Sequence, residues 1–221
     1  LYDHPGRRLF LARDRAGEKP LYYRHAEKRL AFASELKALF ADPGCPRVLD
    51  PDALDAYLAF GYVPHDQCII RGIRKLPQGH ALVYDVAADS VRTWQYWALP
   101  ERHAPEQADD EELVARLEST LLDAVRLRLI ADVPVGVMLS GGIDSSLITA
   151  MAARVSTRVK TFTISFPGHG SYDESGHARS VADHFSTDHV VLAAEPVTVD
   201  LLPELARQFD EPLADSSMVP T

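Results

Sequence analysis

Cysteine is scarce in this sequence, which contains only Cys45 and Cys68 among its 221 residues. The two lie far apart, and neither belongs to a C-x-x-C pair, the spacing typical of zinc ligands. The sequence therefore predicts neither a zinc site nor a disulfide scaffold, and we expect a reducing, cytoplasmic setting.

Long apolar runs and an excess of basic residues are also missing. Even a stretch without Asp, Glu, Lys or Arg, such as Thr161–Tyr172, falls well short of the ~20 apolar residues of a membrane helix. Lys and Arg number 23 against 32 Asp and Glu, which gives a net charge of −9, whereas a nucleic-acid-binding protein needs clustered positive charge. We expect no transmembrane segment, no membrane partner and no nucleic-acid partner.

What is present is the composition of a globular protein, with 46% hydrophobic and 25% charged residues. The first residue is Leu1, and no basic-then-apolar leader precedes the first strand-like run. The last residues, 216–221, complete no helix or strand. We therefore expect no signal peptide and interpret the sequence as a fragment that begins and ends within domains.

The first half of the sequence is rich in short strand-like runs separated by polar turns. Such runs favour antiparallel neighbours at the edge or end of a sheet, and they lie at 8–12, 20–23 and 29–33. Seven prolines between positions 43 and 105 then indicate a connecting region with short elements. The elements expected there are a helix over 51–60 and strands near 81–84 and 93–97.

From Asp109 the pattern changes to alternating helices and strands. Acidic residues at 109–112 precede an apolar residue at every fourth position from Leu113 to Leu129, which is typical of an amphipathic helix. The continuous apolar run Val133–Leu139 predicts a buried parallel strand. The remaining expected elements are a helix at 144–154, a strand at 160–166, a helix at 173–184, a strand at 189–192 and a helix at 197–209. This alternation predicts an open α/β fold with a mainly parallel sheet.

The most informative stretch is Ser140-Gly-Gly-Ile-Asp-Ser-Ser146, between a predicted strand and a predicted helix. Adjacent glycines let the backbone approach a ligand closely, and the first N–H groups of the helix attract an anion. Asp144 would repel a bare phosphate, so it suits a Mg²⁺ ion that bridges carboxylate and phosphates. The stretch is not a Walker A motif, because no Gly-Lys-Ser/Thr follows. The alternative is a plain turn with Ser140 as the N-cap.

This heptad resembles the PP-loop of the ATP pyrophosphatase superfamily. In that superfamily the loop holds the β,γ-pyrophosphate of ATP while a substrate oxygen attacks the α-phosphorus, giving an adenylate and pyrophosphate. Other stretches resemble, in order and spacing, the glutamine-hydrolysing asparagine synthetase family. They are Ala12–Tyr23, Phe32–Leu39, Thr161–Phe166, Tyr172–Glu174 and Asp210–Ser217.

The resemblance implies three parts. Residues 1–42 would end an N-terminal-nucleophile (Ntn) glutaminase domain, 43–108 would form a connector, and 109–221 would begin the PP-loop synthetase domain. The nucleophile of such a glutaminase is a chain-terminal Cys, so Cys45 and Cys68 do not fill that role and we expect no glutaminase activity from this chain.

The resemblance also implies the ligands. Contacts to ATP phosphates and Mg²⁺ would come from Ser140, Gly141, Gly142, Asp144, Ser145 and Ser146. Leu139 and Ile164 would lie near the adenosine, although both also suit plain core packing. The implied reaction activates aspartate with ATP and transfers ammonia derived from glutamine, so the partners would be small-molecule substrates, with a homodimer as one option for assembly.

Several alternatives stay open. The protein could be an amidotransferase for another carboxylate, a β-lactam synthetase-like adenylating enzyme, or a non-catalytic nucleotide-binding domain. Asp210 and Asp215 could face the ATP or lie in an ordinary polar loop. Asp173 is favoured as a helix cap over a substrate ligand. A metal site is less favoured than solvent-facing positions for four histidines, His169, His177, His184 and His189.

Overall fold

The computed structural model describes residues 1–101, 109–168, 173–194 and 199–215, and the chain divides into two compact units. One unit comprises 1–102 with 198–219, and the other comprises 103–197. The predicted His169 and Tyr172, and also Ser216 and Ser217, lie outside the described residues.

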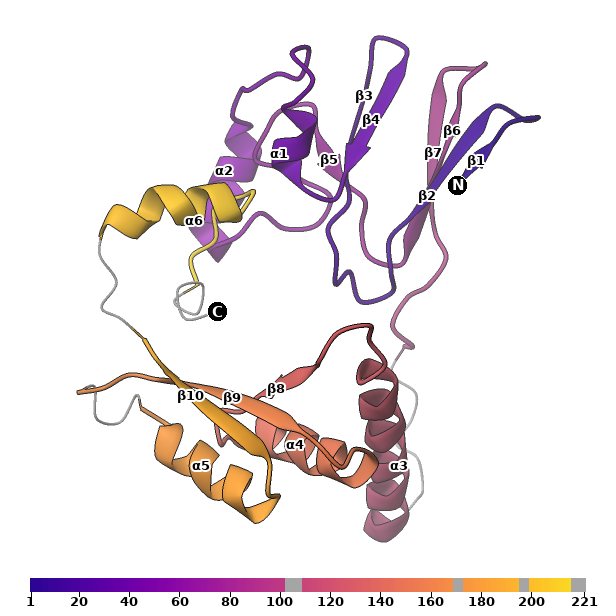
Figure 1. Ribbon diagram of the computed structural model, residues 1–221. Helices are drawn as coiled ribbons and strands as arrows, with labels where there is room; N and C mark the ends of the chain where they lie inside the picture. The colour runs from indigo at the N-terminus through magenta and orange to yellow at the C-terminus, as the bar shows by residue number, and fades with distance from the viewer. Residues whose placement is uncertain (102–108, 169–172, 195–198, 216–221) are drawn as a thin grey trace. The chain divides into compact units, whose positions relative to one another are not determined.

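Two antiparallel sheets form the first unit (Figure 1). The strands of one, in spatial order, are β1 (Tyr2–Asp3), β2 (Arg8–Ala12), β6 (His80–Asp85) and β7 (Ser90–Gln95). Those of the other are β4 (Arg29–Ala33), β3 (Tyr22–Ala26) and β5 (Arg74–Lys75). The antiparallel pairing expected for the first forty residues is therefore confirmed, although β2 pairs with the distant β6, Arg8 lying opposite Asp85.

Helices complete the first unit: α1 (Leu36–Leu39), α2 (Pro51–Phe60), the 3-10 helix η2 (Val199–Leu201) and α6 (Leu202–Gln208). The predicted bounds of α2 are confirmed. Its start is fixed by Asp50, whose side chain accepts hydrogen bonds from the N–H groups of Asp52 and Ala53, and by Pro51 in the first turn. It ends at Gly61, whose φ of 78° is the left-handed C-cap conformation.

The core of the first unit has two parts. One surrounds the fully buried Leu36 and includes Tyr22, Cys68 and Ile73. The other lies around Leu76, Leu82 and Tyr84. Both cysteines are buried free thiols that contribute to the first part.

The second unit contains a parallel sheet of three strands in the order β10-β9-β8 (Figure 1). Its elements are α3 (Asp110–Arg128), β8 (Gly136–Met138), α4 (Ile143–Val155), β9 (Lys160–Ser165), α5 (Ser175–His184) and β10 (Asp188–Ala193). Parallel pairing of all three strands confirms the expected arrangement. The protein is thus a mixed α/β structure with antiparallel and parallel sheets.

Some predicted boundaries are wrong for identifiable reasons. The first parallel strand, β8, covers three residues and not the whole of Val133–Leu139. Val133 lies outside the strand and is 70% exposed, so an apolar residue at this position does not indicate a place in the sheet. Strand β3 runs to Ala26, not Tyr23, because Glu27 and Lys28 (φ 53° and 57°) form a tight turn that keeps the pairing with β4.

In the part of the chain that the structure describes, no helix combines the length and the apolar character needed to cross a bilayer.

A polar network joins the two antiparallel sheets of the first unit. The carboxylate of Asp89, in the β6–β7 turn, contacts His25 Nε2 at 2.8 Å and accepts the Tyr84 hydroxyl at 2.9 Å. The same hydroxyl lies 3.1 Å from the carbonyl of Lys28. The hydrogen bonds from His25 and Tyr84 hold the pKa of Asp89 below its usual value.

We predict that Asp89→Asn lowers the stability of this unit at pH 7. Because the folded pKa is depressed, the contribution of Asp89 is complete above the unfolded pKa of about 3.9 and disappears as the pH falls through the folded pKa. Urea unfolding followed by fluorescence reports on this unit, since the two tryptophans, Trp94 and Trp97, both belong to it. Equal midpoints for Asp89→Asn and the exposed control Asp55→Asn at pH 7 would contradict the prediction.

Candidate functional site

The glycine loop, residues 139–142, connects the carboxyl end of β8 to the start of α4. The N-cap of α4 is Gly142, so no capping side chain covers the first turn of this helix. The alternative reading of Ser140 as the N-cap is wrong, because the helix begins at Ile143 and Gly142 occupies the N-cap position. The Ser140 hydroxyl accepts from the Gly142 N–H, at 3.3 Å, which lies before the first turn. An uncapped helix N-terminus presents N–H groups and the positive end of the helix dipole to an anion.

Gly141 is required by the packing of the protein itself. Its φ is 84°, a conformation that L side chains rarely adopt. A Cβ at this position would lie 2.6 Å from the backbone nitrogen of Ala178 and 2.6 Å from the Cβ of His177. The loop therefore lies directly against the first turns of α5 as well as at the start of α4.

Gly142 differs, because none of the described residues requires a glycine there. Its φ is −68°, which any residue adopts, and a Cβ would meet only the Ser140 hydroxyl, at 3.3 Å. Packing and conformation thus leave room for a side chain immediately in front of the helix. A glycine at such a place keeps the approach to the N–H groups open for a ligand.

Serine hydroxyls hold the loop together. Those of Ser140 and Ser145 lie 3.0 Å apart, and the Ser145 hydroxyl lies 3.2 Å from the Gly142 carbonyl. The N–H of Ser146 donates to the same carbonyl and begins the helical ladder. Asp144 is exposed in the first turn of α4, so the structure brings the predicted phosphate-binding residues and the predicted metal-binding carboxylate to one helix terminus.

The two residues expected near adenosine differ in their burial. The side chain of Leu139 is 1% exposed and packs with Ala178 and Ala182. Its N–H donates to Phe162 and its carbonyl accepts the Thr163 hydroxyl. Ile164 is half-buried in β9. Core packing and hydrogen bonds within the protein thus account for both the side chain and the main chain of Leu139.

Asp173 accepts a hydrogen bond from the first N–H of α5, but it lies one residue before the N-cap, which is Glu174 and not Asp173 as the sequence predicted. Its carboxylate accepts from the Ser175 N–H at 3.0 Å and from the Ser165 hydroxyl at 2.9 Å, which ties the end of β9 to the start of α5. The hydrogen bonds from Ser175 contribute most, and together with the bond from Ser165 they hold the pKa of Asp173 below its usual value.

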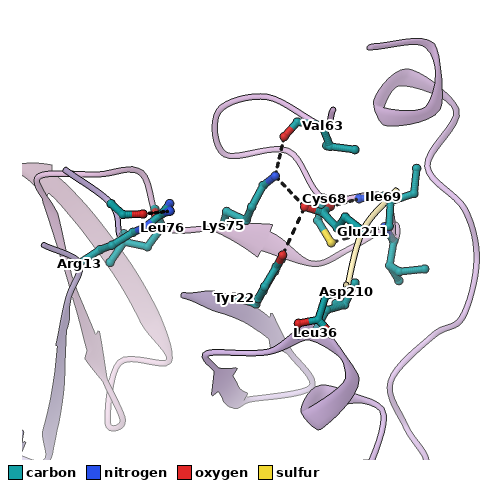
Figure 2. Close-up of polar contacts among 12 residues, drawn as sticks. Arg13, Tyr22, Leu36, Val63, Cys68, Ile69, Lys75, Leu76, Asp210 and Glu211 are labelled. Carbon is teal, nitrogen blue, oxygen red and sulfur yellow. Dashed lines mark hydrogen bonds and ion pairs between the residues drawn. The ribbon is translucent and has the colours of Figure 1, made fainter. Parts of the chain in front are cut away.

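The predicted acidic and histidine candidates elsewhere have other partners. The carboxylate of Asp210 accepts from the backbone N–H groups of Leu36, at 2.6 Å, and Lys37, at 3.2 Å (Figure 2). His189 contacts the Thr161 hydroxyl at 2.9 Å. Among the described residues, no group of three or more His, Cys, Asp or Glu side chains could hold a metal ion.

Sequence reasoning missed the buried ion pair of Lys75 and Glu211, whose charged atoms lie 2.8 Å apart (Figure 2). Its members are 136 positions apart, so no local pattern links them. The available signal was the pair of charges Arg74 and Lys75 between the apolar Ile73 and Leu76, and it does not show which of the two is buried.

Comparisons with known proteins match both halves of the chain. The glutamine amidotransferase domain family matches residues 1–97, and the asparagine synthase family matches residues 116–221. A Methanocaldococcus jannaschii protein, provisionally named an asparagine synthetase (glutamine-hydrolyzing), is 33% identical over 224 residues, covering 100% of this chain and 43% of that protein.

Two further relatives align along nearly the whole chain. Asparagine synthetase (glutamine-hydrolyzing) 1 of Bacillus subtilis is 31% identical, over 96% of this chain and 33% of its own length. Amidase chry2 of Gibberella zeae is 32% identical, over 97% of this chain and 34% of its own length. The chain thus spans less than half the length of these relatives. Because both family models and the relatives agree along its length, the chain belongs to the glutamine-hydrolysing asparagine synthetase family.

Proposed function

We propose that this chain is part of an enzyme that makes asparagine from aspartate, glutamine and ATP. In the proposed reaction a side-chain carboxylate oxygen of aspartate attacks the α-phosphorus of ATP, and pyrophosphate leaves. Ammonia from glutamine then attacks the acyl carbon of the adenylate, forms the amide and releases AMP. The second unit would carry the PP-loop of an ATP pyrophosphatase, and the first would belong to an Ntn-type glutaminase.

The observation that carries this proposal is the open helix terminus at Gly142. Gly141 is explained by packing against α5, whereas a Cβ at Gly142 would meet, among the described residues, only the movable Ser140 hydroxyl at 3.3 Å. A missing side chain in front of uncapped N–H groups is what a phosphate group requires. The absence of a P-loop lysine favours a bound pyrophosphate over transfer of the γ-phosphoryl group.

The roles of the loop residues follow from their positions. The N–H groups of the loop and of the first turn of α4 would bind the β- and γ-phosphates, together with the hydroxyls of Ser140, Ser145 and Ser146. Asp144 would hold Mg²⁺, which would neutralise charge on the leaving pyrophosphate. Main-chain groups near Leu139 and Ile164 would bind the adenosine.

The two cysteines are poor candidates for the glutaminase nucleophile. Burial raises the pKa of the Cys68 thiol to about 12 and raises that of Cys45 above its ordinary value. Both are therefore thiols at neutral pH, whereas the attacking species in such chemistry is the thiolate.

A second candidate is amide formation on another carboxylate. It is favoured by Amidase chry2 and by Amidase chyE of Penicillium rubens, which is 30% identical over 97% of this chain. The same stretch of sequence thus occurs in proteins with a different name. Assaying aspartate against other carboxylic acids, with amide product and AMP as readouts, separates the two candidates.

We predict that Gly142→Ser weakens pyrophosphate binding without destabilising the fold. Serine is a preferred N-cap residue, so it would cap α4 and occupy the place of the anion. Titration calorimetry with Mg²⁺-pyrophosphate should show at least about a tenfold loss of affinity, equivalent to about 1.4 kcal/mol.

Gly176→Ser is the matched control, since a Cβ at Gly176 in α5 has nothing within 4 Å. Equal affinities for the two serine variants would show that the open terminus at Gly142 does not bind phosphate.

We also predict that Asp144→Asn weakens pyrophosphate binding only when Mg²⁺ is present. The amide keeps the size of the side chain but lacks the charge that attracts the metal. We expect about a tenfold loss of affinity in Mg²⁺ and no loss in EDTA. The control is Asp183→Asn, an exposed aspartate in α5. A loss of the same size with and without Mg²⁺ would rule out the metal-binding role.

A further inference from the structure

A short segment of the region matched by the asparagine synthase family (the synthase part) folds with the region matched by the glutamine amidotransferase domain family (the amidotransferase part). Residues 209–214 follow α6 and lie within the range 116–221 matched by the asparagine synthase family. In the structure they belong to the first unit, which is built mainly from residues 1–102. We call residues 209–214 the returning segment.

Glu211 is the centre of its attachment (Figure 2). One carboxylate oxygen accepts the Ile69 N–H at 2.8 Å. The other accepts from Lys75 Nζ at 2.8 Å and from the Tyr22 hydroxyl at 3.3 Å. Lys75 Nζ also donates to the carbonyl of Val63 at 2.6 Å. Both charged side chains are nearly buried, with 11% and 12% of their surfaces exposed.

Contacts on either side of Glu211 reinforce this attachment. Asp210 caps α1, whose own N-cap residue Glu35 makes no side-chain capping bond. The N–H of Ala214 donates to the Gly61 carbonyl at 2.7 Å. The returning segment is thus attached to several separate parts of the first unit.

The physical character of the pair indicates positioning more than stability. A buried ion pair contributes little more, and often less, to stability than a well-packed apolar pair of similar volume, because both charges lose their hydration. The two charged groups must stay within contact distance, because either charge left alone in the interior is strongly unfavourable. The pair therefore excludes alternative placements of the segment that would separate the two charges.

We infer that Lys75 and Glu211 are positioning residues that hold the returning segment, which belongs to the synthase part, in the first unit. Resting on the proposed function, this assignment gives the pair a role in coupling: it keeps the returning segment attached to the first unit, which the use of glutamine-derived ammonia by the synthase part would require. Neither residue is assigned a contact with substrate.

Hydrogen exchange of the 221-residue chain tests the positioning. Glu211→Gln and Lys75→Met each leave one buried charge unpaired, and the double variant Lys75→Met/Glu211→Gln leaves none. We expect both single variants to lower the urea midpoint reported by tryptophan fluorescence and the double variant to restore it. In all three variants, amide exchange in the returning segment should be at least about tenfold faster than in the unsubstituted chain. Each variant lacks the attraction between Lys75 and Glu211 that holds the segment.

The control is Arg74→Met, which removes the neighbouring charge in β5. Arg74 pairs with Asp66 and is 66% exposed, so its loss should leave exchange in the returning segment unchanged. A double variant that restores both the midpoint and the protection of the segment would overturn the inference, because the pair would then be replaceable packing. So would unchanged exchange in the single variants.

The coupling is tested in a catalytically complete protein that contains this chain. With glutamine as nitrogen source, the unsubstituted protein should form amide and glutamate in matched amounts. The double variant should release glutamate within about twofold of normal and form several-fold less amide. Matched amounts in the double variant would overturn the coupling role. Absence of amide in the unsubstituted protein would overturn the proposed function and leave the exchange result standing.

Discussion

The backbone at Gly141 sets the geometry on which the candidate site depends. It combines a left-handed conformation with a distance to α5 that excludes even a methyl group. The turn therefore brings the start of α4 and the first turns of α5 together at the carboxyl end of the parallel strands. In open α/β sheets this edge is where ligands bind, because the loops there are free to vary while the sheet holds their ends. A loop constrained in this way holds its N–H groups in a fixed orientation, which is the preorganisation that the proposed binding of an anion would use.

The sequence predicted the parts of the structure that local rules determine. Helix α2 begins after Asp50, at Pro51, and ends at Gly61 because of capping and conformational preferences that act within a few residues. The alternation of helices and strands after Asp109 was sufficient for the parallel sheet, since crossover connections admit few alternatives. The heptad from Ser140 to Ser146 was visible because all of its members lie in one short stretch.

What could not be predicted depends on contacts between distant residues. The apolar run Val133–Leu139 does not show where strand pairing begins, and only three of its residues pair with β9. The different reasons for the two adjacent glycines are equally hidden, because the neighbours of Gly141 belong to a helix that starts more than thirty residues later. The burial of Lys75 could not be predicted from the sequence, because a buried charge needs a counterion and the counterion, Glu211, is distant in the sequence.

The capping of α1 by Asp210 has a consequence for the order in which the protein forms during synthesis. A helix of four residues is far too short to persist alone, and its cap lies 174 positions further along the chain. At a translation rate of about 5–20 residues per second, roughly 9 to 35 seconds pass between the two. During that interval the N-terminus of α1 lacks its cap, and Lys75 lacks its counterion for the roughly 7 to 27 seconds that its 136-residue separation from Glu211 takes. The nascent first unit therefore completes neither the cap of α1 nor the charge pair of Lys75 until residues 210 and 211 have been made.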